Sequence, residues 1–393
     1  MPSPLPQPAT NRLQVVDALR GFAIMAIMLL HNLEHFDFYF QPDYLPTWLK
    51  TLDVWVWDIL FFLFAGKTYA IFALLFGLTF HIMFTNQARK GKDFRLRFVW
   101  RSFLLLLFGI VNSMFYQGDI LVFYAVLGAS LVLVSKLSNT AVLITAIILL
   151  LQPTEWVKLL QIANDPTVVA TDPLSWSYFG KTSEYLSGNS LLAVIKGNLT
   201  TGKTAVILWS YENGRFLQTP ALFMLGMLIG RKNLFAPSPA NSLFWKRVLG
   251  AAVLLFALLY SLKLFTPDLI ARKAVADVWS VIVTSWANFA FMFVWVALFT
   301  LVFKLKAAQR VLTKLEVFGC MSLTNYVMQS IIGSVIYYGF GLGLYKYTGA
   351  TMSLVIGILL FLLQLAFCRW WMKNHSHGPL EGLWHRLTWI LPG

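Results

Sequence analysis

Charged residues are scarce in this chain. They make up 12% of its 393 residues, whereas an average soluble domain carries ~25%. Hydrophobic residues reach 58% instead, and they stand in runs long enough to cross a lipid bilayer. This composition excludes an ordinary soluble domain and predicts an all-α, polytopic membrane protein.

Acidic residues are scarcer than basic ones: the chain has 17 Asp and Glu and 31 Lys and Arg, so its formal net charge is +14. A nucleic-acid-binding domain gathers such charge on one soluble face, whereas here the basic residues lie between apolar runs. Membrane topology explains that placement better, because cytoplasmic loops are rich in Lys and Arg. We therefore expect membrane lipids and no nucleic acid as partners. The oligomeric state stays open, a dimer included.

Cysteine is nearly absent as well. Cys320 and Cys368 both lie in apolar runs, which excludes a disulfide framework or a cysteine metal site. A glycine-rich phosphate loop is also lacking, since 339–344 has no strand-to-helix setting. The first apolar run is too long for a signal peptide and has no small-residue cleavage site, so it predicts a retained helix.

Ten apolar runs approach the ~20 residues that span the hydrocarbon core of a bilayer. They cover 13–33, 55–85, 98–116, 119–135, 140–160, 214–231, 247–265, 278–303, 317–340 and 351–372. The second run is interrupted at Gly66 and Lys67, which leaves open whether it is one helix or a broken pair. With the N-terminus inside, the basic loops fall on the cytoplasmic side. We expect about ten transmembrane helices in one bundle, with both termini cytoplasmic, in the inner membrane of a bacterium.

Three regions follow from this count. An N-terminal tail covers 1–12, a transmembrane helical domain covers 13–372 with an extracytoplasmic connection at 161–213, and a cytoplasmic interfacial segment covers 373–393. The last segment contains GPLEGLWHRLTW, which is too short to span a bilayer. Its Trp384 and Trp389 suit the headgroup level.

The first run carries an unusual number of ionisable residues: Asp17, Arg20, His31, Glu34 and His35. On one helix Arg20 and His31 share a face ~16 Å apart. Asp17 precedes Arg20 by three residues, and Glu34 and His35 follow His31 by three and four, which are the spacings of touching side chains. Two polar clusters are therefore expected, one at each end of the helix.

These clusters support three interpretations. The structural one pairs Asp17 with Arg20 near the inner surface and leaves His31 at the outer interface. The second makes His31 a general base, with Glu34 fixing its tautomer and His35 beside it. The third is a metal site, because HNLEH matches the H-x-x-E-H zinc pattern. No distant third ligand stands out, so we predict no metal.

Several polar residues lie in or beside other apolar runs. They are Asp58 and Lys67 in the second run, Asp119 in the turn before the fourth, Arg215 at the start of the sixth, and Asn325 and Gln329 in the ninth. Such groups usually face the bundle interior, and polar stripes more often join helices than bind substrate. With Asp17 and Arg20, they are the candidate substrate-binding residues.

Along nearly all its length the chain resembles the bacterial YeiB-like family, also called domain-of-unknown-function 418. The resemblance is carried by DALRGFAIMAIMLLHN (17–32), IFALLFG (71–77), GDILVFYAVLG (118–128), ALFMLGMLIGR (221–231), GCMSLTNYVMQSII (319–332) and GPLEGLWHRLT (378–388). That family has no settled activity and has been connected with transport.

The first helix is also similar to that of a transmembrane acyltransferase superfamily, in which an Arg is followed after ten residues by a His. Arg20 and His31 match that spacing, although YeiB-like members commonly carry Asn at the position of His31. The resemblance implies acyl-CoA as a cytoplasmic co-substrate, an outer hydroxyl acceptor, His31 as base and Arg20 near the donor, with no tightly bound cofactor.

Chemistry agrees with this implication, because acyl transfer to a hydroxyl needs a proton acceptor that titrates near neutral pH. The competing hypothesis is a transporter or flippase of small or lipid-linked molecules. In that case Asp58, Lys67, Asp119 and Arg215 line a midplane pathway.

Overall fold

The computed structural model describes residues 13–40 and 42–390, and all regular elements in these ranges are helical. In chain order they are α1 (Gln14–Leu33), α2 (Thr47–Phe64), α3 (Thr68–Ala88), α4 (Arg95–Ser113), α5 (Leu121–Leu127), α6 (Ala129–Val134), α7 (Asn139–Leu150), α8 (Pro153–Asn164), α9 (Leu174–Leu186), α10 (Leu191–Gly197), the π-helix η1 (Asn198–Gly202), α11 (Lys203–Glu212), α12 (Arg215–Arg231), α13 (Pro239–Leu269), α14 (Lys273–Val302), α15 (Lys306–Leu312), η2 (Thr313–Leu315), α16 (Glu316–Cys320), α17 (Ser322–Tyr337), η3 (Leu344–Lys346), α18 (Ala350–Trp371) and α19 (Pro379–Thr388). The predicted tail 1–12 lies outside the described residues.

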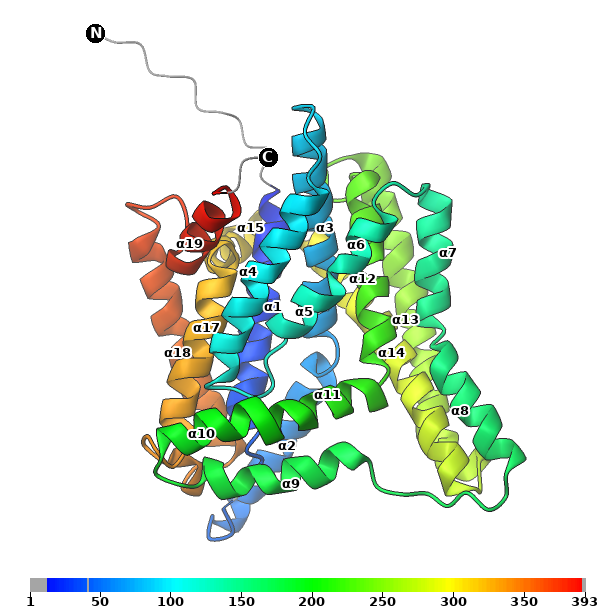
Figure 1. Ribbon diagram of the computed structural model, residues 1–393, viewed down its shortest axis with the longest axis vertical. Coiled ribbons are helices and arrows are strands. Elements are labelled where there is room, and N and C mark those ends of the chain that lie inside the picture. Colours follow the sequence, from blue (N-terminus) through cyan, green and yellow to red (C-terminus); the bar gives the residue numbers. More distant parts are fainter. Residues whose placement is uncertain (1–12, 41, 391–393) are drawn as a thin grey trace.

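Within these ranges, eight helical segments are long and apolar enough to cross a membrane. They are Gln14–Leu33, Thr47–Ala88, Arg95–Ser113, Asn139–Asn164, Leu191–Glu212, Pro239–Leu269, Lys273–Val302 and Ala350–Trp371. The chain is therefore all-helical with multiple candidate spans, as its composition predicts. Most of these helices run along the long axis of the molecule, whereas α9, α10 and α11 lie across its lower end (Figure 1).

Several apolar runs are broken inside the bundle. Gly66, in the left-handed conformation with φ +76°, separates α2 from α3, so the second run is a broken pair. Besides the one-residue interruption at Gly128 between α5 and α6, two runs that we expected as continuous helices are broken by a turn, which corrects the prediction. Gln152 adopts φ +56° before Pro153, and the right-handed α conformation that would continue α7 is disfavoured in a residue that precedes proline. A second break at Met321 separates α16 from α17.

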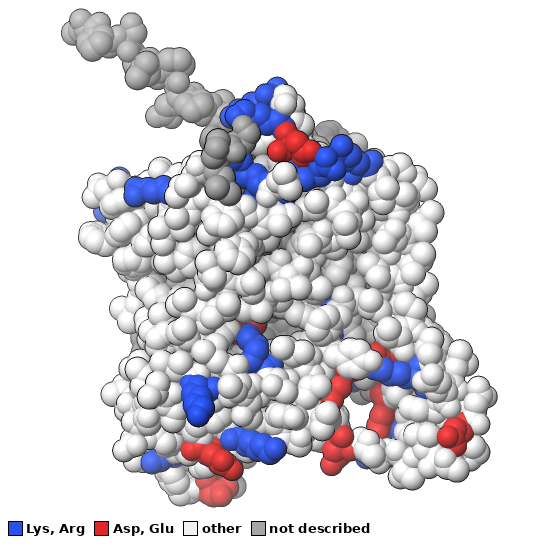
Figure 2. Space-filling view, viewed as in Figure 1, with Lys and Arg blue, Asp and Glu red and all other residues white. Residues whose placement is uncertain are grey.

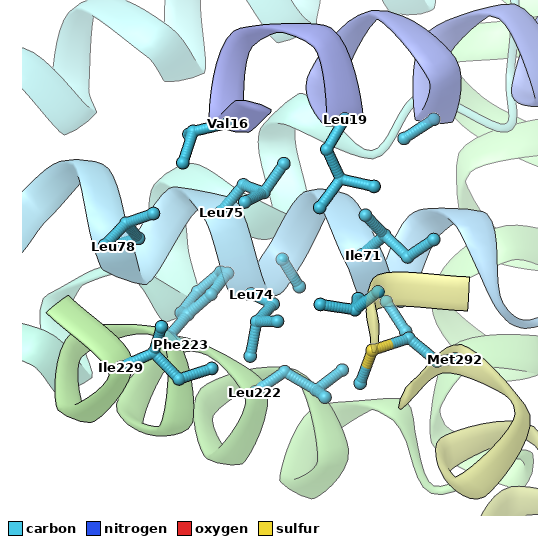
Figure 3. Packing of buried hydrophobic residues seen from close by; sticks show 14 of the residues in the cluster. Val16, Leu19, Ile71, Leu74, Leu75, Leu78, Leu222, Phe223, Ile229 and Met292 are labelled. Carbon is cyan, nitrogen blue, oxygen red and sulfur yellow. The ribbon is translucent and has the colours of Figure 1, made fainter. Parts of the chain in front are cut away.

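The hydrophobic core is centred on α3, which packs between α1 and α12 (Figure 3). Leu19 of α1, Leu74 and Leu75 of α3, and Leu222 and Phe223 of α12 are at most 1% exposed. Many side chains on the outer helices remain exposed, α13 above all. An apolar outer surface with a buried central helix is the arrangement expected when lipid is the solvent.

Glycine lets two helix pairs cross at backbone contact. A Cβ on Gly226 of α12 would collide with the carbonyl oxygen of Leu74, and one on Gly77 would collide with that of Phe223. Gly319 of α16 makes a similar crossing with α1. Small residues at crossings are typical of membrane helices, because packing rather than hydrophobic burial holds such helices together.

The C-terminal segment forms α19, which packs against α4 and α17. The Arg101 guanidinium lies 3.4 Å from the centroid of the Trp384 ring, and the Trp384 Nε1–H donates to the Arg101 carbonyl at 3.0 Å. Glu381 accepts bonds from the backbone N–H groups of Leu323 and Thr324, at 2.6 and 3.0 Å.

In Figure 2 most charge gathers at the two ends of the molecule, with a broad and nearly uncharged band below the upper end.

Candidate functional site

The candidate site begins where α1 ends. His31 lies in the last turn of α1, and the next residues form a tight turn with positive φ at His35 (48°), Phe36 (57°) and Asp37 (68°). Left-handed backbone is costly for residues other than glycine and often accompanies a functional site. Packing holds the turn, because the Tyr338 hydroxyl donates to the Phe36 carbonyl at 2.6 Å and the Phe36 ring fills the space that a Cβ on Gly333 would need.

Among residues 13–40 and 42–390, the partners of His31 contact one ring nitrogen only. Its Nδ1 lies 3.3 Å from Glu34 Oε2 and 3.0 Å from the Tyr116 hydroxyl oxygen. The Tyr116 hydroxyl in turn donates to Asp37 Oδ1 at 3.4 Å. The His31 and Glu34 side chains are 16% and 13% exposed, so the pair is mostly enclosed by protein while part of the imidazole stays accessible.

These bonds assign the tautomer of His31. The Glu34 carboxylate only accepts, and the Tyr116 hydroxyl can accept as well as donate, so the proton between them and His31 belongs on Nδ1. Nε2 then carries a lone pair. In the described part of the chain Nε2 has no hydrogen-bond partner. A histidine with one nitrogen fixed by a carboxylate and the other open is arranged to accept a proton.

Two further ionisable groups, Asp37 and Lys203, flank this cluster. Burial, and next the negative charge of Glu34, raise the pKa of Asp37 well above its ordinary value, which favours the protonated acid. Lys203, at the start of α11, attracts Asp37 electrostatically and lies 3.5 Å from the carbonyl oxygens of Gln117 and Asp119. α11 therefore brings a positive charge to the end of α1.

Asp119 has a local role. Its Oδ1 accepts from the Asn112 side-chain amide at 2.7 Å, and its Oδ2 accepts from the Val122 N–H at 2.9 Å. Such a bond satisfies a free N–H at the start of α5. Asp119 thus fixes the α4–α5 turn that carries Tyr116 to His31.

At the inner end of α1 the predicted pair is present. Arg20 Nη1 lies 2.7 Å from Asp17 Oδ1, and Nη2 donates to the Thr79 hydroxyl at 3.0 Å. The side chains are 18% and 12% exposed. Since α1 is continuous, the rise per residue separates Arg20 from His31 by ~16 Å.

His35 does not join His31. It is fully buried on the side of α18, where its Nε2 lies 2.8 Å from Ser353 Oγ and 3.2 Å from Thr348 Oγ1, and its ring stacks on Tyr337. Within the described residues there is no group of three or more His, Cys, Asp or Glu that could hold a metal ion. His35 therefore anchors the turn to α18 rather than adding a second ring to the His31 cluster.

The two predicted residues of α17 differ from each other. Asn325 donates to the Phe318 carbonyl at 3.0 Å and accepts from the Cys368 thiol at 3.3 Å, so it bridges the break before α17 and joins α18. Gln329 is fully buried, and neither atom of its amide has a hydrogen-bond partner in the described part of the structure. Tyr326 accepts from the Ile120 N–H, and Gly333 contacts Phe36. Gln329 lies between Tyr326 and Gly333 at helical spacing, so it shares the face of α17 that is turned to the α1 cluster.

The remaining predicted residues lie elsewhere. Asp58 is exposed on α2 and has no ion pair within 4.0 Å among the described residues. The positive charges of Lys67 and Arg215 repel each other. Arg215 lines a separate cavity with Gln218 and residues of α14. The four residues that would line one transport pathway therefore lie in three separate places, with Asp119 in the α4–α5 turn, Asp58 on the surface of α2, and Lys67 near Arg215.

Sequence reasoning missed Tyr116, Asp37 and Lys203. The signal for Tyr116 was its position beside the polar turn at 117–119, in an otherwise apolar stretch. Asp37 and Lys203 carried no such signal, because only the left-handed turn and the crosswise helix α11 bring them to His31.

The fold and the site together define the class of this protein. It is an all-helical, multi-pass membrane protein with a polar cluster at one end of its first helix. Residues 229–391 match the family described as "Protein of unknown function (DUF418)". The chain is 28% identical over 422 residues to the uncharacterized protein YxaH of Bacillus subtilis (strain 168), covering 99% of this chain and 97% of that protein.

It is also 26% identical over 407 residues to the uncharacterized protein YeiB of Escherichia coli (strain K12), covering 95% of each chain. An uncharacterized 39.9 kDa protein from the amylase 3' region of Bacillus acidopullulyticus is 23% identical over 379 residues, covering 96% of this chain and 94% of that one. The family match and these similarities together support assignment of the chain to a YeiB-like DUF418 family. No solved structure matches it.

Proposed function

We propose that this protein is a membrane acyltransferase that moves an acyl group from a cytoplasmic thioester, such as acyl-CoA, to a hydroxyl on the outer side. The acceptor is a glycan or a small metabolite. The observation that carries the proposal is the hydrogen bonding of His31: Glu34 and Tyr116 contact Nδ1, and Nε2 is left to accept a proton, with part of the ring accessible.

In this reaction Nε2 of His31 takes the proton of the acceptor hydroxyl as the oxygen attacks the thioester carbonyl. The carbon–sulfur bond breaks, and the thiolate leaves with the proton that His31 returns. Glu34, 3.3 Å from Nδ1, stabilises the imidazolium that exists between these two proton transfers. Acyl donor and acceptor hydroxyl are thereby converted into ester and thiol, and no tightly bound cofactor takes part.

A basic cavity at the opposite end suits the head of such a donor. Its volume is about 380 Å³, and it is lined by Gln87, Lys90, Lys92, His385 and Trp389. Lysines bind phosphate groups, and an indole ring offers a face on which a base can stack. Arg20 on the inner half of α1 is the natural next contact for a donor that extends from this cavity toward His31.

We also propose ten membrane crossings with both termini cytoplasmic. In this count α2 with α3, α5 with α6, α7 with α8, and α16 with α17 each make one crossing, and α12 makes another. The segment Leu191–Glu212 makes none, because α10 and α11 lie across the others in Figure 1. The orientation is supported by basic loops such as 89–97, which belong inside. The bacterial relatives support the cytoplasmic (inner) membrane of a bacterium as the location.

Transport of a small or lipid-linked molecule is the second candidate. The break at Gly66 between α2 and α3 and the adjacent cations Lys67 and Arg215 favour it, since broken helices and buried charges line transport pathways. Against it, Asp58 and Asp119 lie outside this group of cations.

The test uses the purified full-length protein in lipid nanodiscs with labelled acetyl-CoA and candidate glycans. His31→Ala and His31→Asn are compared with His375→Ala, a control at an exposed histidine beyond α18. We expect transfer or thioester hydrolysis by the wild type and the control, and a loss of about 10²- to 10⁴-fold, typical of a missing general base, in both His31 variants. Undiminished turnover in the His31 variants would refute the role of His31. A wild type that does not bind the donor would favour transport.

A further inference from the structure

A second polar cavity, of about 150 Å³, lies between the start of α12 and the middle of α14. Asn213, Arg215 and Gln218 line one side, and Ser280, Thr284 and Asn288 line the other. A cavity of about this volume accommodates a molecule as large as benzene, so it has room for one phosphate group. His31 does not line it.

Arg215 enters this cavity without a partner for its charge. Its guanidinium carbon lies 3.8 Å from the centroid of the Tyr69 ring and 5.2 Å from that of Trp209. Among the described residues no carboxylate lies within 4.0 Å of it, and no hydrogen bond to it is formed. Glu212, three residues earlier, is instead bonded to Ser175. The five N–H donors of its guanidinium therefore have no acceptor among the described residues.

The opposite wall is a row of donors. Ser280, Thr284 and Asn288 are spaced by four residues on α14, so they share one face of the helix. None of the three side chains has a hydrogen-bond partner elsewhere in the described structure. Gln218, 3% exposed, is held rigidly, because its amide nitrogen donates to Ser285 Oγ at 2.9 Å and its oxygen accepts from Tyr69.

Positive charge accumulates around this cavity. Lys67 is 7% exposed and is repelled by Lys263 and Arg215. Its Nζ contacts the rings of Phe62 and Phe291 at 5.7 and 5.5 Å. In the described residues no carboxylate is paired with these cations within 4.0 Å. Buried like charges without a counter-ion are costly, and an anion in the cavity removes that cost.

We propose that this cavity binds an anion of phosphate chemistry, with Arg215 as its counter-charge and the α14 side chains as hydrogen-bond donors. The planar guanidinium binds two phosphate oxygens side by side, and the hydroxyls of Ser280 and Thr284 and the amide of Asn288 are available to the others. Both free phosphate and the phosphodiester of a lipid headgroup have this chemistry. The site is independent of His31 and of acyl transfer.

The first experiment measures thermal unfolding of the delipidated full-length protein in a neutral detergent. Inorganic phosphate is titrated against chloride at equal ionic strength. A lipid arm uses native mass spectrometry to compare retention of phosphatidylglycerol with that of diacylglycerol of the same chains. The variants are Arg215→Gln, Thr284→Val, which keeps the side-chain shape, and Arg247→Gln, a control at an exposed arginine of α13.

We expect saturable stabilisation by phosphate, preferential retention of the phospholipid, or both, in the wild type and in Arg247→Gln. Loss of charge-assisted hydrogen bonds should weaken binding about 10- to 100-fold in Arg215→Gln and by up to about tenfold in Thr284→Val. An effect confined to one arm identifies the source of the phosphate. A wild type with neither effect, or equal affinity in wild type and Arg215→Gln, would overturn the proposal. If Arg215→Gln does not fold, unchanged affinity in Thr284→Val overturns it.

Discussion

Replacing Gly226 by alanine tests the backbone contact between α3 and α12. The added Cβ would fall inside 3.0 Å of the Leu74 carbonyl oxygen and reach 3.0 Å from the Leu78 nitrogen. Both neighbours are backbone atoms and cannot turn aside as a side chain does. Because carbon and carbonyl oxygen normally stay ~3.3 Å or more apart, the two helices would have to separate by more than ~1 Å.

Two opposing terms decide the magnitude. Alanine is ~1 kcal/mol more favourable than glycine inside a helix, whereas overpacking a close contact typically costs ~1–3 kcal/mol. Here the separation also loosens Leu74 and Leu222, which are both fully buried. Because backbone opposes backbone, the overpacking cost should lie near the upper end of its range, and the helix preference of alanine offsets ~1 kcal/mol of it. We therefore expect Gly226→Ala to lower the free energy of unfolding by about 2 kcal/mol.

The assay is equilibrium unfolding by sodium dodecyl sulfate in mixed micelles, followed by tryptophan fluorescence. Gly250→Ala is the matched control, because a Cβ there meets nothing within 4 Å, and it should raise stability by up to ~1 kcal/mol. Equal or greater stability of Gly226→Ala relative to Gly250→Ala would refute the close-contact reasoning.

Three further predictions concern the ends of the bundle. Arg20→Ala leaves Asp17 without this ion pair and should lower the free energy of unfolding by about 1–3 kcal/mol. This is less than the ~3–5 kcal/mol of a fully buried pair, because the two side chains keep 18% and 12% exposure. An unchanged melting temperature would count against this prediction. Burial raises the pKa of Glu381 above 4.5, so its contribution to stability is full below pH 4.5 and is lost as pH rises through the raised pKa. Glu381→Gln stays neutral and should flatten that fall in a pH series of melting temperatures, whereas an identical pH profile would contradict the shift. Reporter fusions at 92, 180, 240 and 310 should read inside, outside, inside and inside, and a cytoplasmic 180 would overturn the proposed topology.

The pairs predicted within one helix are present because they depend on helical periodicity alone. Asp17 with Arg20, and His31 with Glu34, both sit three residues apart, and both are in contact. A spacing of three or four residues fixes such neighbours regardless of what packs around the helix. His35 obeys no such rule, because it lies beyond the last turn of α1, where the backbone turns left-handed and carries the ring to Ser353.

The sequence did not predict which side chains of different helices lie together. The grouping of Asp58 with Lys67 and Arg215 rested on their presence in apolar runs, and the structure leaves Asp58 exposed while Arg215 faces α14. The sequence shows that a charged residue in an apolar run is costly to place in lipid. It does not state which neighbouring helix offers the partner.

The sequence by itself determined that this chain is helical and that its apolar runs belong in lipid, because a bilayer offers backbone groups no partner outside the helix. It also determined the neighbours within each helix, since those follow from 3.6 residues per turn. Only the tertiary structure decided that Tyr116 and Glu34 share one nitrogen of His31, and that Arg215 faces the hydroxyls of α14. These contacts depend on how helices cross, and the crossings are set by close packing at residues such as Gly226 and Gly319, whose partners lie far away in the sequence.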